Sequence, residues 1–253
     1  MGIKVAVLAS GSSGNSYFVE DNEVSFFVDA GVGKRTIADI SKKVGDKPCY
    51  LFLTHSHSDH VKGLKYFLKT FNLTVFCSMP TARDLYENGN DIDNIKILDD
   101  KIRYLFNNFS VFPFKVNHDC DGTFGYRFSF KNGEISFVTD TGIIDKTILD
   151  SIDGSNAIFL ESNYDEDMLK NGRYPLHLKK RILSKNGHLS NKDAIKTLHE
   201  IYGQKLKKVF FSHISEENNS YDLIDKYCRY VEKTLKMEAF TLRQKSYYNF
   251  SLF

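Results

Sequence analysis

The chain has 253 residues and a formal net charge of +2. Its length is enough for one large core or two small domains, and no Pro/Ser-rich or low-complexity stretch offers a linker, so we expect a single domain over residues 1–253. This charge is far from the strongly basic value that is typical of nucleic-acid-binding proteins. The sequence also contains no apolar run of about eighteen residues, so it predicts no membrane-spanning helix.

Hydrophobic periodicity predicts strands and helices in three parts of the chain. The first part alternates strands at 3–8, 17–20, 24–28, 50–53 and 73–77 with helices at 34–44 and 61–70. The middle is mainly β, with strands at 103–106, 110–116 and 126–130, and an Asn132-Gly133 turn that joins 128–130 to 134–137 as a hairpin. The last part alternates helices at 146–152, 175–184, 190–202 and 221–235 with strands at 157–160, 208–211 and 237–242. Two sheets between outer helices would bury most of the 21 phenylalanines and 14 tyrosines.

A dense group of metal-ligand side chains follows the predicted strand at 50–53. His55, His57, Asp59 and His60 put three imidazoles and one carboxylate into six positions. Alternation places His55 and His57 on one side of an extended segment, with Asp59 and His60 turning back over them into the next helix. Such groups would be costly to desolvate without a cation. A polar loop that is His-rich by chance is the alternative, and the dense tract between a strand and a helix favours a metal site.

Other histidines and aspartates close predicted strands or loops, namely His118, His188, His213, Asp29 and Asp140. Taken singly, such a residue is more often a cap or a turn residue than a ligand. Together with the histidine cluster, the pattern favours ligands.

Two neighbouring divalent ions would account for these residues. One ion would be held by His55, His57 and His118, the other by Asp59, His60 and His213, and Asp140 would bridge the pair. This leaves room for a hydroxide between ions spaced roughly 3.5 Å apart, as hydrolytic two-metal sites need. Such ligands suit zinc, manganese and iron alike, and zinc is our first expectation.

These residues resemble the signature of the metallo-β-lactamase superfamily. Residues 54–60 match its His-x-His-x-Asp-His motif, Asp29 matches its first acidic motif, and His118, Asp140 and His213 match its later ligands in order. Three further stretches are similar to the YycJ/VicX group: 10–16 (SGSSGNS), 172–175 (GRYP) and 187–191 (GHLSN). The resemblance covers about residues 5–215. It implies an α/β fold, the αββα sandwich with two mixed β-sheets flanked by helices.

The resemblance also narrows the chemistry. A water bridging two cations ionises near neutral pH, and we expect Asp59 to orient the resulting hydroxide for hydrolysis. Lactam-cleaving members generally do not use the bridging aspartate, so Asp140 argues against antibiotic hydrolysis. Flavin-linked diiron members replace the second histidine of the signature by glutamate, so His57 argues against redox chemistry. Hydrolysis of a phosphodiester or a thioester remains.

The segment Gly187-His188-x-Ser190 resembles the His-x-Ser/Thr element of phosphodiesterase members. We expect His188 to be catalytic, giving a proton or hydrogen bond to a phosphoryl oxygen, while Glu161 orients its other nitrogen. Ser190 is expected beside the substrate as well. A local alternative is that Ser190 caps a helix beginning at Asn191, with Asp193 as its capping-box partner, and both interpretations can hold together.

Two segments have a phosphate-binding interpretation beside a structural one. The basic strip comprises Lys170, Arg173, Lys179, Lys180, Arg181 and Lys185, with no acidic residue between them. It could carry a phosphate backbone toward the metals, with Arg173 as a substrate contact, or it is a solvated helix face. The loop 10–16 is a phosphate-binding nest or a tight turn supporting the ligands, and the second is favoured because a P-loop ending is absent. Asp29 is expected to orient the cluster rather than to be a plain turn residue before Gly31.

Cysteine usage bears on location. The four cysteines are Cys49, Cys77, Cys120 and Cys228, and no two form a Cys-x-x-Cys pair. The N-terminus also lacks a signal-peptide pattern, so we expect a soluble, reduced, cytoplasmic protein. Cys120 follows His118 closely, but an inert thiol is favoured because seven better ligands complete both ion sites.

We therefore expect a dinuclear-metal phosphodiesterase, in the first place a nuclease acting on DNA ends, because the YycJ/VicX group is associated with exonuclease activity. Nucleic acid is the expected partner, with RNA as the alternative to DNA. Hydrolysis of a small or cyclic phosphodiester is a second alternative. A non-catalytic metal-binding regulatory partner is a third, from a different class of protein.

Overall fold

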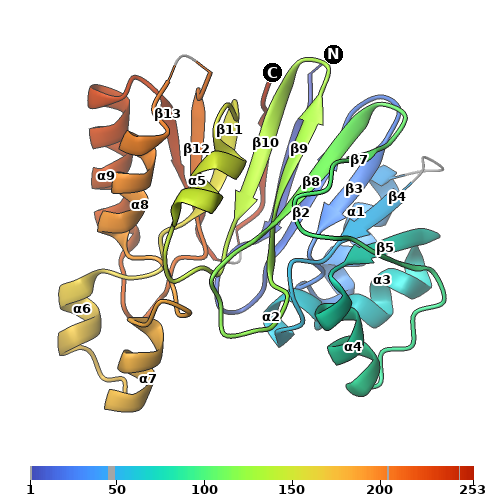
Figure 1. The fold of residues 1–253 in the computed structure, drawn as a ribbon, viewed down its shortest axis with the longest axis horizontal. Helices are drawn as coiled ribbons and strands as arrows, with labels where there is room; N and C mark the ends of the chain where they lie inside the picture. Colours follow the sequence, from blue (N-terminus) through green and yellow to red (C-terminus); the bar gives the residue numbers. More distant parts are fainter. Residues whose placement is uncertain (1, 45–48, 204, 245) are drawn as a thin grey trace.

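The computed structural model describes residues 2–44, 49–203, 205–244 and 246–253. Within these residues, two seven-stranded sheets face each other (Figure 1). The first sheet has the order β14 (Tyr248–Ser251), β1 (Lys4–Ala9), β2 (Ser16–Glu20), β3 (Ser25–Val28), β4 (Cys49–Phe52), β5 (Leu73–Cys77) and β6 (Ile95–Ile97). The second has the order β13 (Glu238–Thr241), β12 (Lys208–Ser212), β11 (Ala157–Glu161), β10 (Gly133–Val138), β9 (Phe124–Phe130), β8 (Phe109–Lys115) and β7 (Tyr104–Leu105).

Both sheets are mixed. In the first, β1, β2 and β3 pair antiparallel, and β3 to β6 pair parallel. In the second, β7 to β10 pair antiparallel, and β10 to β13 pair parallel. Parallel strands end at the same edge of a sheet, so the loops after β3, β4, β8, β10, β11 and β12 meet at one end of the sandwich.

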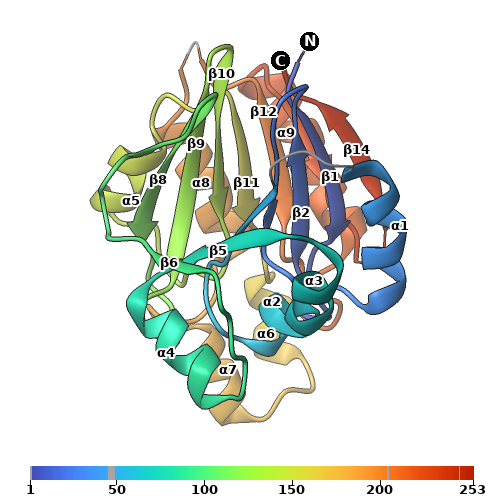
Figure 2. The ribbon, with the colours of Figure 1, turned by 90° about the vertical axis from the view of Figure 1, so that its right-hand side faces the viewer.

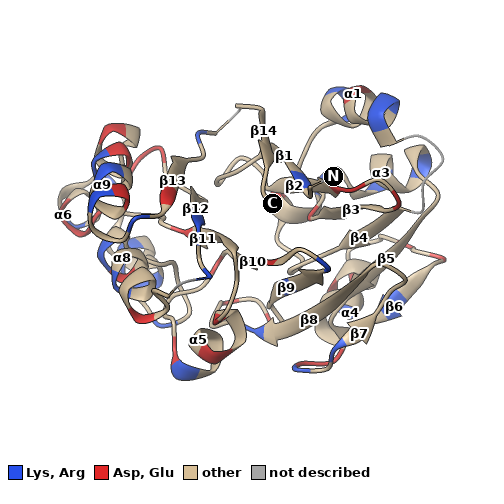
Figure 3. Ribbon diagram, turned by 90° about the horizontal axis from the view of Figure 1, so that it is seen from above, with Lys and Arg blue, Asp and Glu red and all other residues tan. Residues whose placement is uncertain are grey.

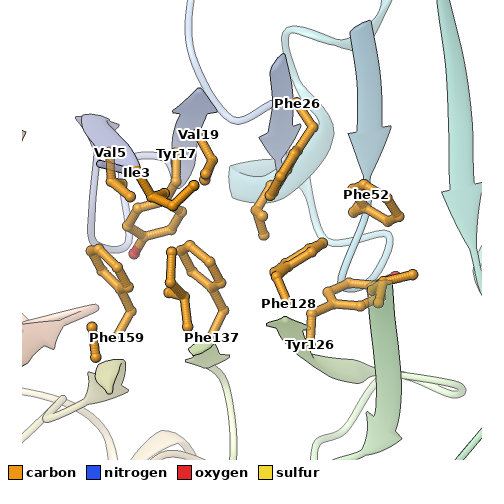
Figure 4. Close-up of a cluster of buried hydrophobic side chains, with 14 of the residues drawn as sticks. Ile3, Val5, Tyr17, Val19, Phe26, Phe52, Tyr126, Phe128, Phe137 and Phe159 are labelled. Atoms are coloured by element: carbon orange, nitrogen blue, oxygen red, sulfur yellow. The ribbon is translucent and has the colours of Figure 1, made fainter. Parts of the chain in front are cut away.

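Phenylalanines fill the space between the sheets. Figure 4 shows Phe26 and Phe52 from the first sheet pointing toward Phe128 and Phe137 from the second. The ring centroids of Phe26 and Phe128 are 4.4 Å apart. The next residue, Phe27, points to the opposite face and packs against Phe67 of a covering helix, at 4.8 Å. Strands buried on both faces explain why apolar residues run through them without interruption.

Helices cover the outer face of each sheet. The first sheet is covered by α1 (Lys34–Val44), α3 (Leu64–Thr70) and α4 (Met79–Glu87), and the second by α5 (Lys146–Ile152), α8 (Asn191–Glu200) and α9 (Tyr221–Thr234). Seen from above, charged residues lie along these outer helices while the sheets lie between them (Figure 3). This confirms the predicted αββα sandwich.

Three short helices lie at the other end of the sandwich from the chain termini. They are α2 (Ser58–Val61), α6 (Glu166–Asn171) and α7 (Leu176–Ile182), and both side views place them toward the lower end of the molecule, with α6 and α7 next to each other (Figures 1 and 2). They stand at the end where the loops from the parallel strands meet. Among the described residues, no helix has the length and apolar character needed to cross a membrane.

The predicted elements are mostly present, with informative differences. The helix expected at 61–70 begins at Ser58 and is interrupted at Gly63, where a Cβ would lie 2.1 Å from the carbonyl oxygen of Val32. Helices α4 and α6 and strands β6 and β14 were not predicted. The start of α4 has a sequence signal, because Ser78 caps the helix by accepting from the Thr81 N–H and a proline lies in the first turn. The two strands are short sheet edges with half-exposed residues, which weakens their periodic signal.

Candidate metal centre

The seven predicted metal ligands lie together at the end of the sandwich where α2, α6 and α7 stand. They come from loops that follow different strands: His55, His57, Asp59 and His60 after β4, His118 after β8, Asp140 after β10 and His213 after β12. Among the described residues, four groups can each bring one ligand atom per residue to within 4.8 Å of the others, and two of these groups are His55, His57 and His118, and Asp59, His60 and His213. These are the two groupings expected from the sequence.

Asp140 lies between the two groups. Its Oδ2 is 3.0 Å from His60 Nε2, and its Oδ1 is 3.9 Å from His118 Nε2. Its side chain is only 2% exposed. A buried carboxylate in this position could contact cations held by either group.

The polar atoms of the cluster are poorly satisfied by the protein alone. His55 is buried, and its Nε2 has no hydrogen-bond partner in the described part of the chain. Asp140 Oδ2 also lacks hydrogen-bond geometry despite its short distance to His60. A buried polar atom without a partner is costly, and a cation would satisfy both. The donor set of imidazoles and carboxylates therefore fits divalent metal ions.

The charges in the cluster point the same way. Burial alone would lower the pKa of His60, but Asp29, Asp140 and Asp59 raise it well above its usual value. Burial would raise the pKa of Asp140, yet His213 and His60 hold it well below its usual value. The buried carboxylates are therefore stabilised by nearby positive charge, which protons on the histidines or bound cations can supply.

Three residues of the site adopt a left-handed backbone conformation. Asp29, Asp140 and His213 have φ of 60°, 55° and 53°. Each lies just after a strand, and residues other than glycine rarely take such values. Conformations of this kind persist where the surroundings enforce them and occur often at functional sites.

Asp29 contacts the cluster as an orienting carboxylate would. Its Oδ2 is 2.7 Å from His60 Nδ1, and its Oδ1 accepts from the backbone N–H of Thr54 at 2.8 Å. Because Nδ1 is engaged in this way, Nε2 of His60 faces the other ligands. His118 is oriented similarly, with its Nδ1 3.2 Å from the carbonyl oxygen of Gly187.

Asn15 is a site residue that sequence reasoning did not single out. Its Nδ2 lies 3.1 Å from Asp59 Oδ2 and 3.0 Å from His60 Nε2, while its Oδ1 accepts from the Gly11 N–H. It belongs to the loop 10–16, whose Ser10 hydroxyl also accepts from the His213 N–H at 3.0 Å. The loop therefore supports the ligands, as the favoured interpretation of its sequence held. The available signal was a polar residue directly after Gly14 in a loop rich in glycine and serine.

Glu161 joins His188 to the ligand His213. Its Oε1 lies 2.7 Å from His188 Nδ1 and 3.0 Å from His213 Nδ1, and its Oε2 accepts from the Thr141 N–H. His188 is 18% exposed and lines a cavity beside the cluster. It is also close enough to Asp140, Glu161 and His213 to form a further group of possible ligands.

Ser190 and Arg173, the other two expected substrate contacts, do not line this cavity. Ser190 is buried and caps α8: its hydroxyl accepts from the Asp193 N–H at 3.0 Å and donates to the Asp193 carboxylate at 2.7 Å. This supports the local alternative, and contact of Ser190 with substrate stays a prediction. Arg173 is exposed between α6 and α7 and is not among the residues that line the cavity. Arg181 lines it instead.

Cys120 lies beside the site without joining it. Its Sγ is 3.3 Å from the Ser56 hydroxyl, which donates to the carboxylate of Asp84. Cys120 is in none of the metal-binding groups found among the described residues.

Comparison with known proteins places the chain in a family. Residues 25–214 match the model of the beta-lactamase superfamily domain. The exodeoxyribonuclease YycJ of Bacillus anthracis is 33% identical over 232 residues, covering 88% of this chain and 86% of that protein. The exodeoxyribonuclease WalJ of Streptococcus pneumoniae is 30% identical over 231 residues, with the same coverage. The metallo-beta-lactamase fold protein YhfI of Bacillus subtilis has the same fold, with a TM-score of 0.75 over 99% of this chain and 100% of that one, at 13% identity. The chain therefore belongs to the metallo-β-lactamase superfamily and resembles its YycJ and WalJ members.

Proposed function

We propose that this chain is a metal-dependent exodeoxyribonuclease. The observation that carries the proposal is the convergence of two carboxylates and five histidines, the seven expected metal ligands, from separate loops beside one cavity. Asp59, Asp140, His188 and His213 all line that cavity. Relatives that match 88% of the chain are named exodeoxyribonucleases, which supports DNA as the substrate.

Two divalent ions are proposed as the cofactor, with zinc first and manganese or iron as alternatives. His55, His57 and His118 would hold one ion, Asp59, His60 and His213 the other, and Asp140 would bridge them. When bound, such ions supply hydroxide at neutral pH and neutralise charge on the attacked phosphate.

The chain's own residues would orient the reactants. Asp59 is partly exposed to the cavity, and its Oδ2 is fixed by Asn15 at 3.1 Å, so it is placed to orient the attacking water. Nδ1 of His188 lies 2.7 Å from Oε1 of Glu161 and the residue lines the cavity, so this contact would leave Nε2 free to face a substrate. His188 would then hydrogen-bond a phosphoryl oxygen through Nε2.

A cytoplasmic location is part of the proposal. All four cysteines are buried and unpaired. Free thiols and a DNA substrate both fit the reducing cytoplasm.

A panel of substrates tests the function. Metal-stripped protein is reloaded with zinc or manganese and given end-labelled linear DNA, closed circular DNA, RNA and a chromogenic phosphodiester. We expect release of nucleotides from linear DNA, no attack on closed circles, and loss of activity in Asp59→Ala. The exposed Asp150→Ala on α5 is a matched control that should retain activity.

Each other outcome identifies an alternative. Degradation of RNA alone would indicate an RNA nuclease, and cleavage of the chromogenic ester alone, without dependence on salt, would indicate a small phosphodiester substrate. No cleavage of any phosphodiester by the reloaded protein would indicate a regulatory metal-binding protein.

A further inference from the structure

The segment between β11 and α8 forms one wall of the cavity beside the metal ligands. It contains α6 and α7, and Figures 1 and 2 show both helices beyond the end of the sheets. Tyr174, Leu178, Arg181 and Ile182 line the cavity. Arg181 and Ile182 follow Leu178 by three and four residues, which places these three on one face of α7, and Tyr174 lies in the turn just before the helix. The α7 segment therefore turns a defined face toward the metal site.

Arg181 is distinguished from the rest of the basic strip. Among the strip's six basic residues, only Arg181 lines the cavity. Lys179, by contrast, donates to the carbonyl oxygen of Lys170 within the α6–α7 segment. A planar guanidinium matches the oxygens of a phosphate better than a lysine does.

The partner of Arg181 ties it to the metal cluster. Its guanidinium pairs with the Asp119 carboxylate. The other oxygen of Asp119 is 3.4 Å from His118 Nε2 and 4.0 Å from His57 Nε2. The Arg181 side chain is still 52% exposed, so it remains accessible to an anion that enters the cavity. A phosphate there would lie next to the one under attack.

Tyr174 offers an aromatic surface in the same cavity. Its ring packs against the small core of Tyr164, Leu169 and Ile182, which fixes its position. It also lines the cavity. Partial burial raises the pKa of its hydroxyl, so the ring is uncharged at cellular pH. A fixed, neutral aromatic ring is a stacking platform for any base, whatever its identity.

We propose that this face of α7 binds the nucleotide next to the cleaved bond, with Arg181 on its phosphate and Tyr174 stacked on its base. The inference rests on the proposed nuclease function and names the contacts that distinguish a DNA strand from a small phosphodiester. Phosphate contacts position a strand, and stacking adds binding without sequence preference.

Single-turnover cleavage of a short DNA strand and of bis(p-nitrophenyl) phosphate tests the proposal. We expect Arg181→Gln and Tyr174→Leu each to lower kcat/KM for DNA about tenfold, the scale of one base–aromatic stack, and to leave the chromogenic ester within twofold. Tyr174→Phe keeps the ring and should retain DNA cleavage. Arg229 and Tyr230 are exposed neighbours in the sequence of α9, and Arg229→Gln and Tyr230→Leu are the matched controls. Neither control should change the cleavage rate of either substrate.

Strands that lack one base supply the stacking test. They carry an abasic site at the terminal or at the penultimate nucleotide. For one of these two abasic strands, we expect the wild-type protein to cleave as slowly as Tyr174→Leu cleaves the intact strand. Tyr174→Leu should cleave that abasic strand no more slowly than it cleaves the intact one.

The possible results distinguish a failure of the inference from a failure of the proposed nuclease function. Equal losses on DNA and on the chromogenic ester would show that the residues act through the fold and would overturn the inference. So would variants that cleave DNA like the wild type. If the wild-type protein releases no nucleotide from DNA, the nuclease function and the inference fall together.

Discussion

His188 lines the cavity beside the proposed metal ligands, and Glu161 contacts its Nδ1. We predict that His188→Ala lowers kcat for DNA by roughly 100-fold or more, the usual contribution of a positioned general acid or base. The bound metal, measured by elemental analysis, should stay at the wild-type level, because the two ligand groups are intact. His199→Ala on α8 is the control, since His199 is exposed and its Nε2 lies 3.1 Å from the hydroxyl of Tyr230 on α9. Full turnover by His188→Ala would remove the proposed role.

Protons and metal ions should compete for the same histidines. The surrounding carboxylates raise the pKa of His60 and His213 well above the usual value although burial opposes this, so without metal both rings hold a proton more tightly than a free imidazole does. Ligands must lose their protons to bind a cation. We therefore predict proton release on zinc addition at pH 7, and weaker zinc binding as the pH falls. Calorimetry in two buffers of different ionisation enthalpy measures the release, and equal heats in both would contradict the prediction.

Among single residues, the sequence allowed the proposed ligands to be singled out because their types and spacing are unusual. His55 to His60 form a dense motif, and Asp29, Asp140 and His213 each follow an apolar strand. Asn15 and Arg181 were harder to assign because asparagine and arginine have many ordinary roles. Their functional positions depend on which loops meet in space, which local spacing does not encode.

Among the elements, the loops after β1, β3 and β4 are held together at Gly31. The Asn15 N–H donates to the carbonyl oxygen of Asp59 at 2.8 Å, and the Gly31 N–H donates to that of Asn15 at 2.8 Å. A Cβ on Gly31 would lie 1.8 Å from the Asp59 carbonyl oxygen. The backbone carrying Asp59 thus approaches the loop after β3 as closely as glycine allows.

We predict that Gly31→Ala forces these loops apart. Unfolding in urea should show a loss of about 1–3 kcal/mol, as for other overpacked sites, together with weaker metal binding. Gly33→Ala is the matched control two residues away, because a Cβ there would meet nothing within 4 Å. If both variants bound metal and unfolded alike, the close approach at Gly31 would not matter for the site.

The central strands and long helices could be predicted because their apolar periods are regular. The α6 helix was missed because it has only six residues. Strands β6 and β14 were missed because an edge strand is defined by its pairing partner, as in Val5 with Phe250, rather than by its own sequence. These elements depend on contacts distant in the chain.

For the whole molecule, the buried core should make folding sensitive to alkaline pH. Burial raises the pKa of Cys49, Cys77 and Tyr17 to about 12. The unfolded chain would ionise the thiols near pH 9 and the phenol near pH 10, while the folded protein keeps all three neutral. The free energy of unfolding should therefore fall as the pH rises from about 9 to about 12.

The double variant Cys49→Ala, Cys77→Ala tests this cause. It should be less stable than the wild type at pH 8, because two buried side chains are shortened. Its stability should also fall less steeply above pH 9 in urea unfolding. An unchanged slope would mean that the thiols do not cause the alkaline loss.

The most direct test of the account is a metal titration of DNA cleavage. Nucleotide release from end-labelled linear DNA is measured while zinc or manganese is added in known equivalents to the stripped protein. We expect no release without metal and a rise that reaches its plateau at two ions per chain. Release by the stripped protein, or a fully loaded protein that leaves DNA intact, would contradict it.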